Sequence, residues 1–169
     1  MKKVIIGCLG AAAIIAAIVA VAIWFLLFRE LPTLDASLAI APEVEMDSTV
    51  TLTITATNSH TRRVTLDSVD IDDSFLAGFQ VVAVDPEPRT TTHMSLTHQR
   101  TWEFGKPLAS RQTFSVTFTL RPAAPGHFSG DVNVCNPNQD FKTLLADVVV
   151  TKKSSNEPPR ATAPTRSRD

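Results

Sequence analysis

Residues 50–57 read VTLTITAT, and this stretch decides the fold. Its apolar residues, Val50, Leu52, Ile54 and Ala56, alternate with four threonines. A period of two places the apolar side chains on one face of an extended strand and the threonines on the other. The stretch therefore predicts a half-buried β-strand with a β-branched outer face.

The same alternation recurs twice further along the chain. It runs through residues 114–120 and again through 128–134, mostly with phenylalanine and valine at the apolar positions. Between these two stretches, the sequence Ala123-Ala124-Pro125-Gly126 has the composition of a tight turn. We therefore predict two further strands joined by a hairpin turn.

Weaker strand patterns surround these three strong ones. The additional predicted strands cover 38–40 (ended by Pro42), 64–71, 79–84, 102–104 before Gly105, and 141–150. Within 64–71 the alternation slips by one residue at Asp67 and Ser68, which predicts a β-bulge. Residues 73–78 fit one helical turn.

These signals predict an all-β domain over residues 34–151, long enough to bury a core of its own. About seven to nine short strands, with turns every eight to twelve residues, are typical of an Ig-like antiparallel β-sandwich. Trp102 and the phenylalanines are expected to fill the space between the sheets. The Cys-Trp-Cys spacing of antibody domains is absent from the sequence.

Residues 45–58, EMDSTVTLTITATN, resemble the second-strand signature of Ig-like modules in bacterial surface proteins. In those modules a turn leads into an alternating strand that ends in an asparagine. Residues 114–134, with Pro-Gly between strands, are similar to the same modules, which include the cell-adhesion-related domains and resemble adaptin appendages. The resemblance implies a sandwich fold and a binding role, and it carries over no catalytic residue. A glycine usual before the second strand is missing here.

A long apolar run lies near the N-terminus of the chain. Residues 4–28 read VIIGCLGAAAIIAAIVAVAIWFLLF, without a charged residue or a proline. At about 1.5 Å of rise per residue, a helix of this length crosses a hydrocarbon core of roughly 30 Å. The stretch predicts an N-terminal transmembrane α-helix that acts as an uncleaved signal anchor. A cleaved signal peptide and lipidation at Cys8 are the alternatives.

The flanking charges predict the orientation of this anchor. Lys2 and Lys3 precede the apolar run, whereas Arg29 alone lies close behind it. Basic residues remain preferentially on the cytoplasmic side. Residues 1–3 are therefore expected in the cytoplasm, 29–33 form a short linker, and the domain is expected outside, in the periplasm or at the cell surface.

Two features mark the surface of the predicted anchor helix. Aromatic side chains gather at its far end, where rings favour the membrane interface; they are Trp24, Phe25 and Phe28. Small residues recur every four positions, a spacing that lets two helix backbones approach closely; they are Ala12, Ala16 and Ala20. Helix pairing and chance recurrence in an alanine-rich segment both account for the second pattern.

The C-terminal residues 152–169 read KKSSNEPPRATAPTRSRD and contain almost nothing apolar, which predicts a disordered tail. Five basic and two acidic residues give the tail a charge of +3, whereas residues 31–151 hold 8 basic and 14 acidic residues, a net charge of −6. A solvated terminus is favoured, because dispersed cations are weaker than the dense clusters that bind lipid. Anionic lipid and cell-wall polymer are the alternatives, and nucleic acid is not an expected partner.

The densest acidic group, Asp67, Asp70, Asp72 and Asp73, is a candidate calcium site. Calcium takes about six to eight oxygen ligands, usually from a tightly folded loop. Here the aspartates alternate with apolar residues, and no glycine supplies a sharp turn. The favoured interpretation is therefore that these carboxylates line the exposed face of a strand.

The histidines and the cysteine provide only weak candidates for chemistry. His93 and His98 lie in a threonine-rich stretch that predicts a loop or an edge strand, while His60 and His127 stand alone. No second pair completes a zinc site, so surface histidines are favoured. Cys135 is interpreted as a free buried thiol; an intermolecular disulfide and a catalytic pair with His127 are the alternatives.

The sequence contains no nucleophile elbow, phosphate loop or zinc-protease motif, so we expect neither an enzyme nor a cofactor. It predicts a single-pass membrane protein that presents an Ig-like interaction or structural module outside the cytoplasm, as a subunit of an envelope complex. The expected partners are the lipid bilayer and another envelope protein or a surface polymer. The alternative is an accessory ligand-binding protein of a transport or secretion system.

Overall fold

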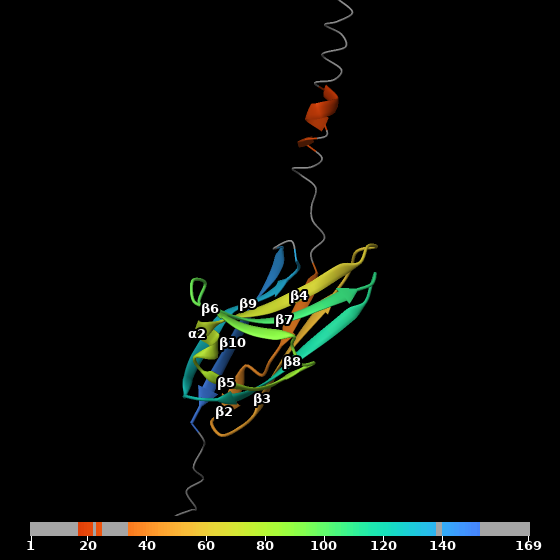
Figure 1. Ribbon diagram of the computed structural model, residues 1–169. Helices are drawn as coiled ribbons and strands as arrows, with labels where there is room; N and C mark the ends of the chain where they lie inside the picture. Colours follow the sequence, from red (N-terminus) through yellow and green to blue (C-terminus); the bar gives the residue numbers. More distant parts are fainter. Residues whose placement is uncertain (1–16, 22, 25–33, 138–139, 153–169) are drawn as a thin grey trace, which may run out of the picture. The chain divides into compact units, whose positions relative to one another are not determined.

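The computed structural model describes residues 17–21, 23–24, 34–137 and 140–152 (Figure 1). The chain divides into two units, residues 1–32 and 33–169. In the first unit, residues 17–21 and 23–24 are helical and exposed, and they include Ala20 and Trp24. Among the described residues, no helix has both the length and the apolar character needed to cross a membrane.

Most of the predicted anchor lies outside the described residues. The same holds for the predicted cytoplasmic residues 1–3, the linker 29–33 and almost all of the tail. Of the residues singled out on the anchor, those outside the description are Cys8, Ala12, Ala16, Phe25 and Phe28. The predictions that concern these residues stay predictions.

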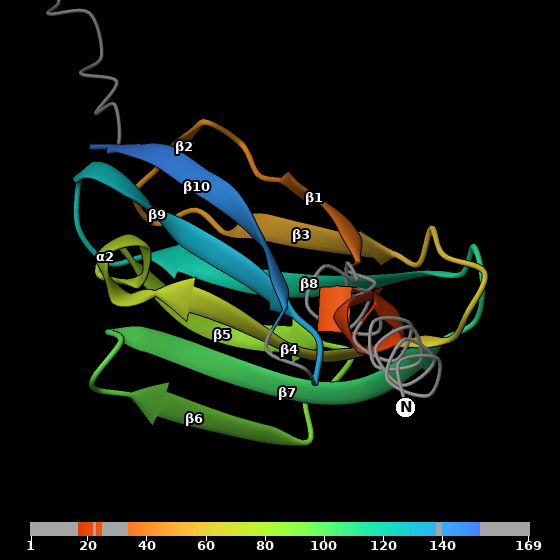
Figure 2. The ribbon, with the colours of Figure 1, turned by 90° about the horizontal axis from the view of Figure 1, so that it is seen from above.

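The second unit consists of two β-sheets packed face to face, so the all-β sandwich is confirmed (Figures 1 and 2). The four-stranded sheet has the order β1 (Asp35–Ala39), β3 (Val50–Thr57), β8 (Thr113–Pro122), β5 (Phe79–Asp85). The six-stranded sheet has the order β2 (Glu43–Glu45), β10 (Phe141–Thr151), β9 (Gly126–Cys135), β4 (Val64–Asp72), β7 (Gln99–Leu108), β6 (Thr90–Met94). Among the strands that the structure describes, β2 and β10 alone pair in parallel. These ten strands exceed the predicted number.

The alternation in β3 produces the pairing expected of it. Leu52 pairs with Phe118 and Ile54 with Val116 across the antiparallel ladder to β8. All four side chains are at most 1% exposed, and the threonines of β3 point to the other face. Removing this apolar surface from water is the main force that holds β3 and β8 against the second sheet.

Aromatic side chains join the two sheets, as predicted. Trp102 on β7 packs edge-on against Phe118 on β8, with 4.9 Å between the ring centroids. Phe75 and Phe79 stack at 5.0 Å next to the short helix α2 (Asp73–Leu76). Phe141 departs from the prediction, because it is 57% exposed at the start of β10.

The predicted hairpin between residues 114–120 and 128–134 is wrong. β8 pairs with β3 and β5, whereas β9 pairs with β4 and β10, so the connection between them crosses from one sheet to the other. The Ala123 backbone N–H donates to the Gly78 carbonyl at 2.8 Å in this crossing. The turn residues indicate that the chain reverses, but they carry no information about which sheet the next strand joins.

Near residue 67 the ladder between β4 and β7 shifts its register, which confirms the predicted irregularity. Leu66 pairs with Lys106 and Ser68 with Glu103, so β7 carries one residue more than β4 there. Gly105 lies in this stretch with φ +54°, a conformation that glycine adopts readily. The predicted short strand 102–104 therefore continues through Gly105 to the end of β7.

Two strands were not among the strands predicted outright. β6 pairs with β7 and forms the edge of the six-stranded sheet, so of the two alternatives predicted around His93, a loop or an edge strand, His93 lies in an edge strand. β2 is only three residues long and pairs with the last residues of β10. Both lack a run of alternating apolar residues, so pairing with a stronger neighbour determines them.

Candidate interaction surface

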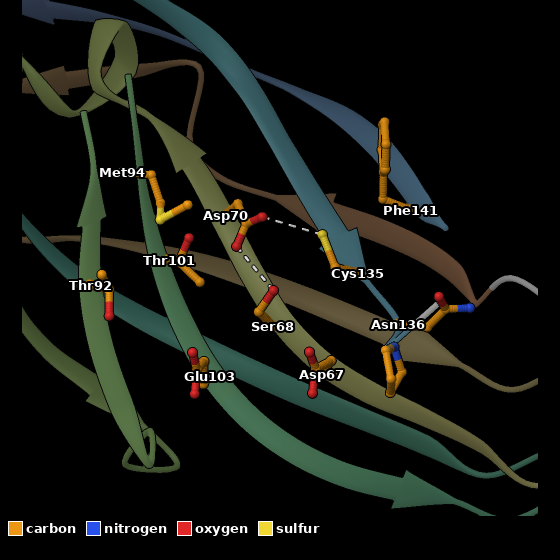
Figure 3. Close-up of a pocket in the computed structure, with 11 residues that line it drawn as sticks. Asp67, Ser68, Asp70, Thr92, Met94, Thr101, Glu103, Cys135, Asn136 and Phe141 are labelled. Carbon is orange, nitrogen blue, oxygen red and sulfur yellow. Dashed lines mark hydrogen bonds between the residues drawn. The ribbon is translucent and has the colours of Figure 1, made fainter. Parts of the chain in front are cut away.

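The six-stranded sheet has one face on the core and one exposed face, which we call the outer face. A groove of about 560 Å³ lies on the outer face (Figure 3). Its lining comes from β4, β6, β7, β9 and the first residue of β10, together with the residues that follow β9. The groove therefore belongs to the sheet itself and crosses most of its strands.

Strand pairing aligns the groove residues in rows. In one row, Ser68 on β4 pairs with Glu103 on β7 and with Cys135 on β9, and Cys135 pairs with Phe141 on β10. Paired residues point to the same face of a sheet. The register shift near residue 67 turns Asp67 and Ser68 to the same side, so both line the groove.

The groove is acidic. Asp67, Asp70 and Glu103 line it, and the lining contains no lysine or arginine. The two central strands of the sheet, β4 and β9, carry four aspartates and no basic residue other than His127. The middle of the outer face therefore attracts positive charge.

Asp70 and Cys135 are directly hydrogen-bonded inside the groove (Figure 3). Asp70 accepts hydrogen bonds from the Ser68 hydroxyl at 3.0 Å and from the Cys135 thiol at 3.3 Å. Burial, followed by the charge of Asp70 and this hydrogen bond, raises the pKa of Cys135 to about 12. Cys135 is a free, half-buried cysteine, and at neutral pH its thiol is protonated.

The candidate calcium ligands do not converge on one point. Asp72 accepts from the Gln99 amide at 2.8 Å and from the Asp131 backbone N–H at 3.0 Å. Asp73 instead pairs with His93, with 2.8 Å between Oδ2 and Nε2. Within the described part of the chain, no group of three or more histidine, cysteine or acidic side chains is placed to hold a metal ion.

His127 and Cys135 are not brought together. They lie eight positions apart on β9, which corresponds to about 26 Å along an extended strand. Each also has a different partner, because His127 pairs with Asp147 while Cys135 donates to Asp70. His60 and His98 lie in loops after β3 and before β7.

An apolar border starts at the acidic groove, where Phe141 and Met94 line it, and continues along the outer face. Phe141, Leu145 and Val149 on β10 are 57%, 62% and 41% exposed, and they recur every four residues on the outer face. At the opposite edge, Met94 on β6 and Leu96 in the following turn are also exposed. In the described part of the second unit, the remaining exposed large hydrophobic residue, Val82, belongs to the four-stranded sheet.

The prediction from sequence missed the apolar border and Glu103. A signal for the border was present in residues 141–150, where apolar residues occupy both parities of the strand. Such a pattern indicates a strand that is apolar on both faces. Because β10 has only its inner face covered by the core, the second apolar face remains exposed.

Comparison with known proteins supports the fold. No protein-family model matches the chain, and no curated protein matches it in sequence. Among solved structures, a cohesin module from a Clostridium perfringens family 33 glycoside hydrolase is similar over 73% of this chain and 100% of that module, with a TM-score of 0.50 and 9% identity.

Two further solved structures are similar over comparable lengths. A CARDB domain from Pyrococcus furiosus, in complex with di-metal ions, matches over 72% of this chain and 90% of its own length, with a TM-score of 0.47 and 14% identity. AvmM, which catalyses macrocyclization in alchivemycin A biosynthesis, matches over 71% and 89%, with a TM-score of 0.47 and 9% identity. The likeness to the cohesin module confirms the generic Ig-like sandwich and extends no further than the fold.

Proposed function

We propose that this protein is a membrane-anchored interaction module whose Ig-like domain binds an envelope protein or a surface polymer outside the cytoplasm. The observation that carries the proposal is the composition of the outer face. Five of the six exposed large hydrophobic residues of the described domain lie on the six-stranded sheet or its β6–β7 turn, and two of them, Met94 and Phe141, line an acidic groove. Exposed apolar side chains gathered on one face are typical of binding surfaces.

The side chains that line the groove favour a binding role over catalysis. Its thiol is protonated at neutral pH, and no histidine lies in its lining to act as a base. The groove thus offers carboxylates, hydroxyls and apolar contacts, which suit recognition of a partner. We therefore assign no reaction to the site.

The anchor and its orientation rest on residues 4–28 and on Lys2 and Lys3. Protease added to intact spheroplasts should digest the domain, since we place it outside the cytoplasmic membrane. A domain that is fully protected until the spheroplasts are lysed would contradict the proposed location.

Matched surface variants test the docking surface. The full chain is purified from membranes with a Phe141→Ser/Leu145→Ser double substitution, and in parallel with Val82→Ser on the four-stranded sheet. A partner that copurifies with the wild type should be retained by V82S and reduced about tenfold or more by the double variant, as expected when two central apolar contacts are removed. Undiminished recovery with the double variant would contradict the proposal.

The groove also supports a second candidate function, an accessory ligand-binding protein of a transport or secretion system. Its volume of about 560 Å³ falls within the usual range for small-molecule pockets, roughly 300–1,000 Å³. Native mass spectrometry of the purified full chain separates the two functions. A small molecule that stays bound to the wild type and is lost from Glu103→Gln, with unchanged protein partners in F141S/L145S, would favour the second.

A further inference from the structure

We propose that the outer face also binds the chain's own C-terminal segment, residues 153–169, so that the tail competes with the external partner. The inference rests on the proposed function in one respect, because both ligands would use the same surface. This segment follows closely on the end of β10, so its starting point on the domain is fixed.

Two carboxylates in the groove have no partner among the described residues of the domain. Asp70 already accepts two hydrogen bonds, but the side-chain carboxylates of Asp67 and Glu103 have no hydrogen bond or ion pair with any described residue. They extend from the neighbouring strands β4 and β7, and Glu103 pairs in register with Ser68, next to Asp67. Two adjacent carboxylates without a cation suit the guanidinium group, which donates paired hydrogen bonds to carboxylates.

The tail supplies the complementary chemistry. Residues 160–168 read RATAPTRSR and contain three arginines and no acidic residue. Between the arginines stand alanine, threonine, proline and serine, which are small enough to lie flat on a sheet surface. The exposed ring of Phe141 beside the groove offers a face on which an arginine can stack.

The length of the tail matches the distance it has to cover. β10 runs from the groove at Phe141 to Thr151, a separation of ten residues or about 33 Å. Counted from Thr151, Arg160 and Arg168 lie 9 and 17 residues further along the chain. An extended, proline-containing segment covers about 28 Å and about 53 Å over those lengths. Arginines therefore reach the groove if the tail runs back over the outer face.

The returning segment would cross the exposed stripe of β10. Val149 and Leu145 lie between the start of the tail and Phe141, all on the outer face. Alanine and proline side chains over this stripe would cover apolar surface that is otherwise in water. A tether of this length gives an effective concentration in the millimolar range, so that even a weak contact would be occupied and still be displaced by a stronger partner.

A competition experiment on the full chain tests the inference. The probe is a fluorescent synthetic peptide of residues 160–168, and the protein is held in an uncharged detergent, without anionic headgroups. Fluorescence anisotropy compares the wild type, a chain that ends at Lys152, and a full-length chain with Arg160, Arg166 and Arg168 replaced by glutamine. We expect the probe to bind the last two about tenfold more tightly than the wild type, because no tethered competitor remains.

Charge variants locate the binding site of the probe. In the chain ending at Lys152, Asp67→Asn/Glu103→Gln should abolish binding, whereas Asp35→Asn/Asp85→Asn on the four-stranded sheet should not change it. Circular dichroism of each variant checks that the domain remains folded. Loss of binding in both double variants, or in neither, would overturn the assignment of the tail to the groove.

Equal affinity of the probe for the full and shortened chains, with continued dependence on Asp67 and Glu103, would overturn the intramolecular contact. That result would leave the docking surface itself intact, since the partner test with F141S/L145S is independent of the tail. A difference that grows with protein concentration would place the tail on a second copy and would also overturn the intramolecular contact.

Discussion

Asn58 illustrates how a single polar side chain stabilises the end of the sandwich where β3 and β7 finish. It is completely buried at the end of β3. Its amide donates to the carbonyls of Arg62, Leu108 and Ala109 at 2.7–3.1 Å, and its Oδ1 accepts from the His60 backbone N–H at 3.0 Å. The asparagine that closes the alternating strand therefore links two loops that lie far apart in sequence.

Substitution of this residue should destabilise the domain. In a soluble fragment of residues 31–152, Asn58→Ala leaves buried carbonyls without a donor, which we expect to lower the free energy of unfolding by about 2–4 kcal/mol. Urea unfolding measures the change. Asn133→Ala on the outer face, which loses one exposed hydrogen bond from Thr143, is the control and should change stability by less than about 1 kcal/mol. Equal losses in the two variants would contradict this role.

The Cys135 thiol gives a second prediction at the residue scale. Its pKa is raised from 9.0 to about 12, first by burial and then by Asp70. At pH 8 the thiolate fraction, and with it the rate of alkylation, should be about a thousandfold lower in the folded chain than in urea, since each pKa unit is tenfold. Peptide mass spectrometry separates Cys135 from Cys8, and similar rates in folded and unfolded chains would refute the prediction.

The same shift has a consequence for stability. Because the folded state holds the thiol proton more tightly than the unfolded state, this group stabilises the fold below pH 9 and its contribution declines as the pH rises from about 9 to about 12. Asp70→Asn removes the second largest cause of the shift. The variant should therefore be alkylated faster than the wild type at the same pH.

The packing of α2 on β9 leaves little room for a side chain at position 130. It lies on β9 beneath α2, where an added Cβ would be 2.7 Å from the Ser74 hydroxyl and 3.0 Å from the Cβ atoms of Asp72 and Phe75. The Ser74 hydroxyl donates to the Ser129 carbonyl at 3.0 Å, so α2 is fastened to β9 at this point. A methyl group here would have to displace the Ser74 hydroxyl and push the Cβ atoms of Asp72 and Phe75 slightly away.

Gly130→Ala should therefore destabilise the fragment by about 1–3 kcal/mol through overpacking. Urea unfolding of G130A and of Ser129→Ala makes the comparison, since the second variant removes only an outward hydroxyl and should be close to wild type. If G130A proved as stable as wild type, α2 would not be packed on β9 as described.

At the scale of elements, strands with strong apolar alternation could be predicted from the sequence. Strands that form only because they pair with a neighbour could not. Residues 50–57 and 114–120 alternate cleanly, and both became core strands. β2 and β6 carry little apolar signal of their own, so only their partners β10 and β7 reveal them. The route from β8 to β9 was predicted wrongly, because a turn sequence reports reversal of the chain and not the choice of sheet.

The candidate site was less accessible to prediction than the fold. The four aspartates were identified, but Asp70, Asp72 and Asp73 have partners on β6, β7 and β9, far away in sequence. Glu103 and Phe141 gain importance only because the register places them beside Ser68 and Cys135. Such rows across a sheet follow from strand order, which local patterns do not specify.

On the scale of the whole molecule, the domain should fold without its N-terminal segment. Its core comes entirely from residues 34–150, which supply every buried hydrophobic side chain among the described residues. A fragment of residues 31–152 should be soluble and give a β-type circular dichroism spectrum with a cooperative thermal transition. A spectrum dominated by helix, or an insoluble fragment, would contradict an independent sandwich.

The central claim is that the outer face of the six-stranded sheet is the docking surface, and site-specific photo-crosslinking in living cells tests it most directly. A photoreactive amino acid replaces Leu145 on the outer face in one strain and Val82 on the four-stranded sheet in another; both positions are exposed. We expect irradiation to yield a discrete crosslinked product at position 145 and none at position 82. A product at position 82 alone, or equal products at both positions, would contradict it.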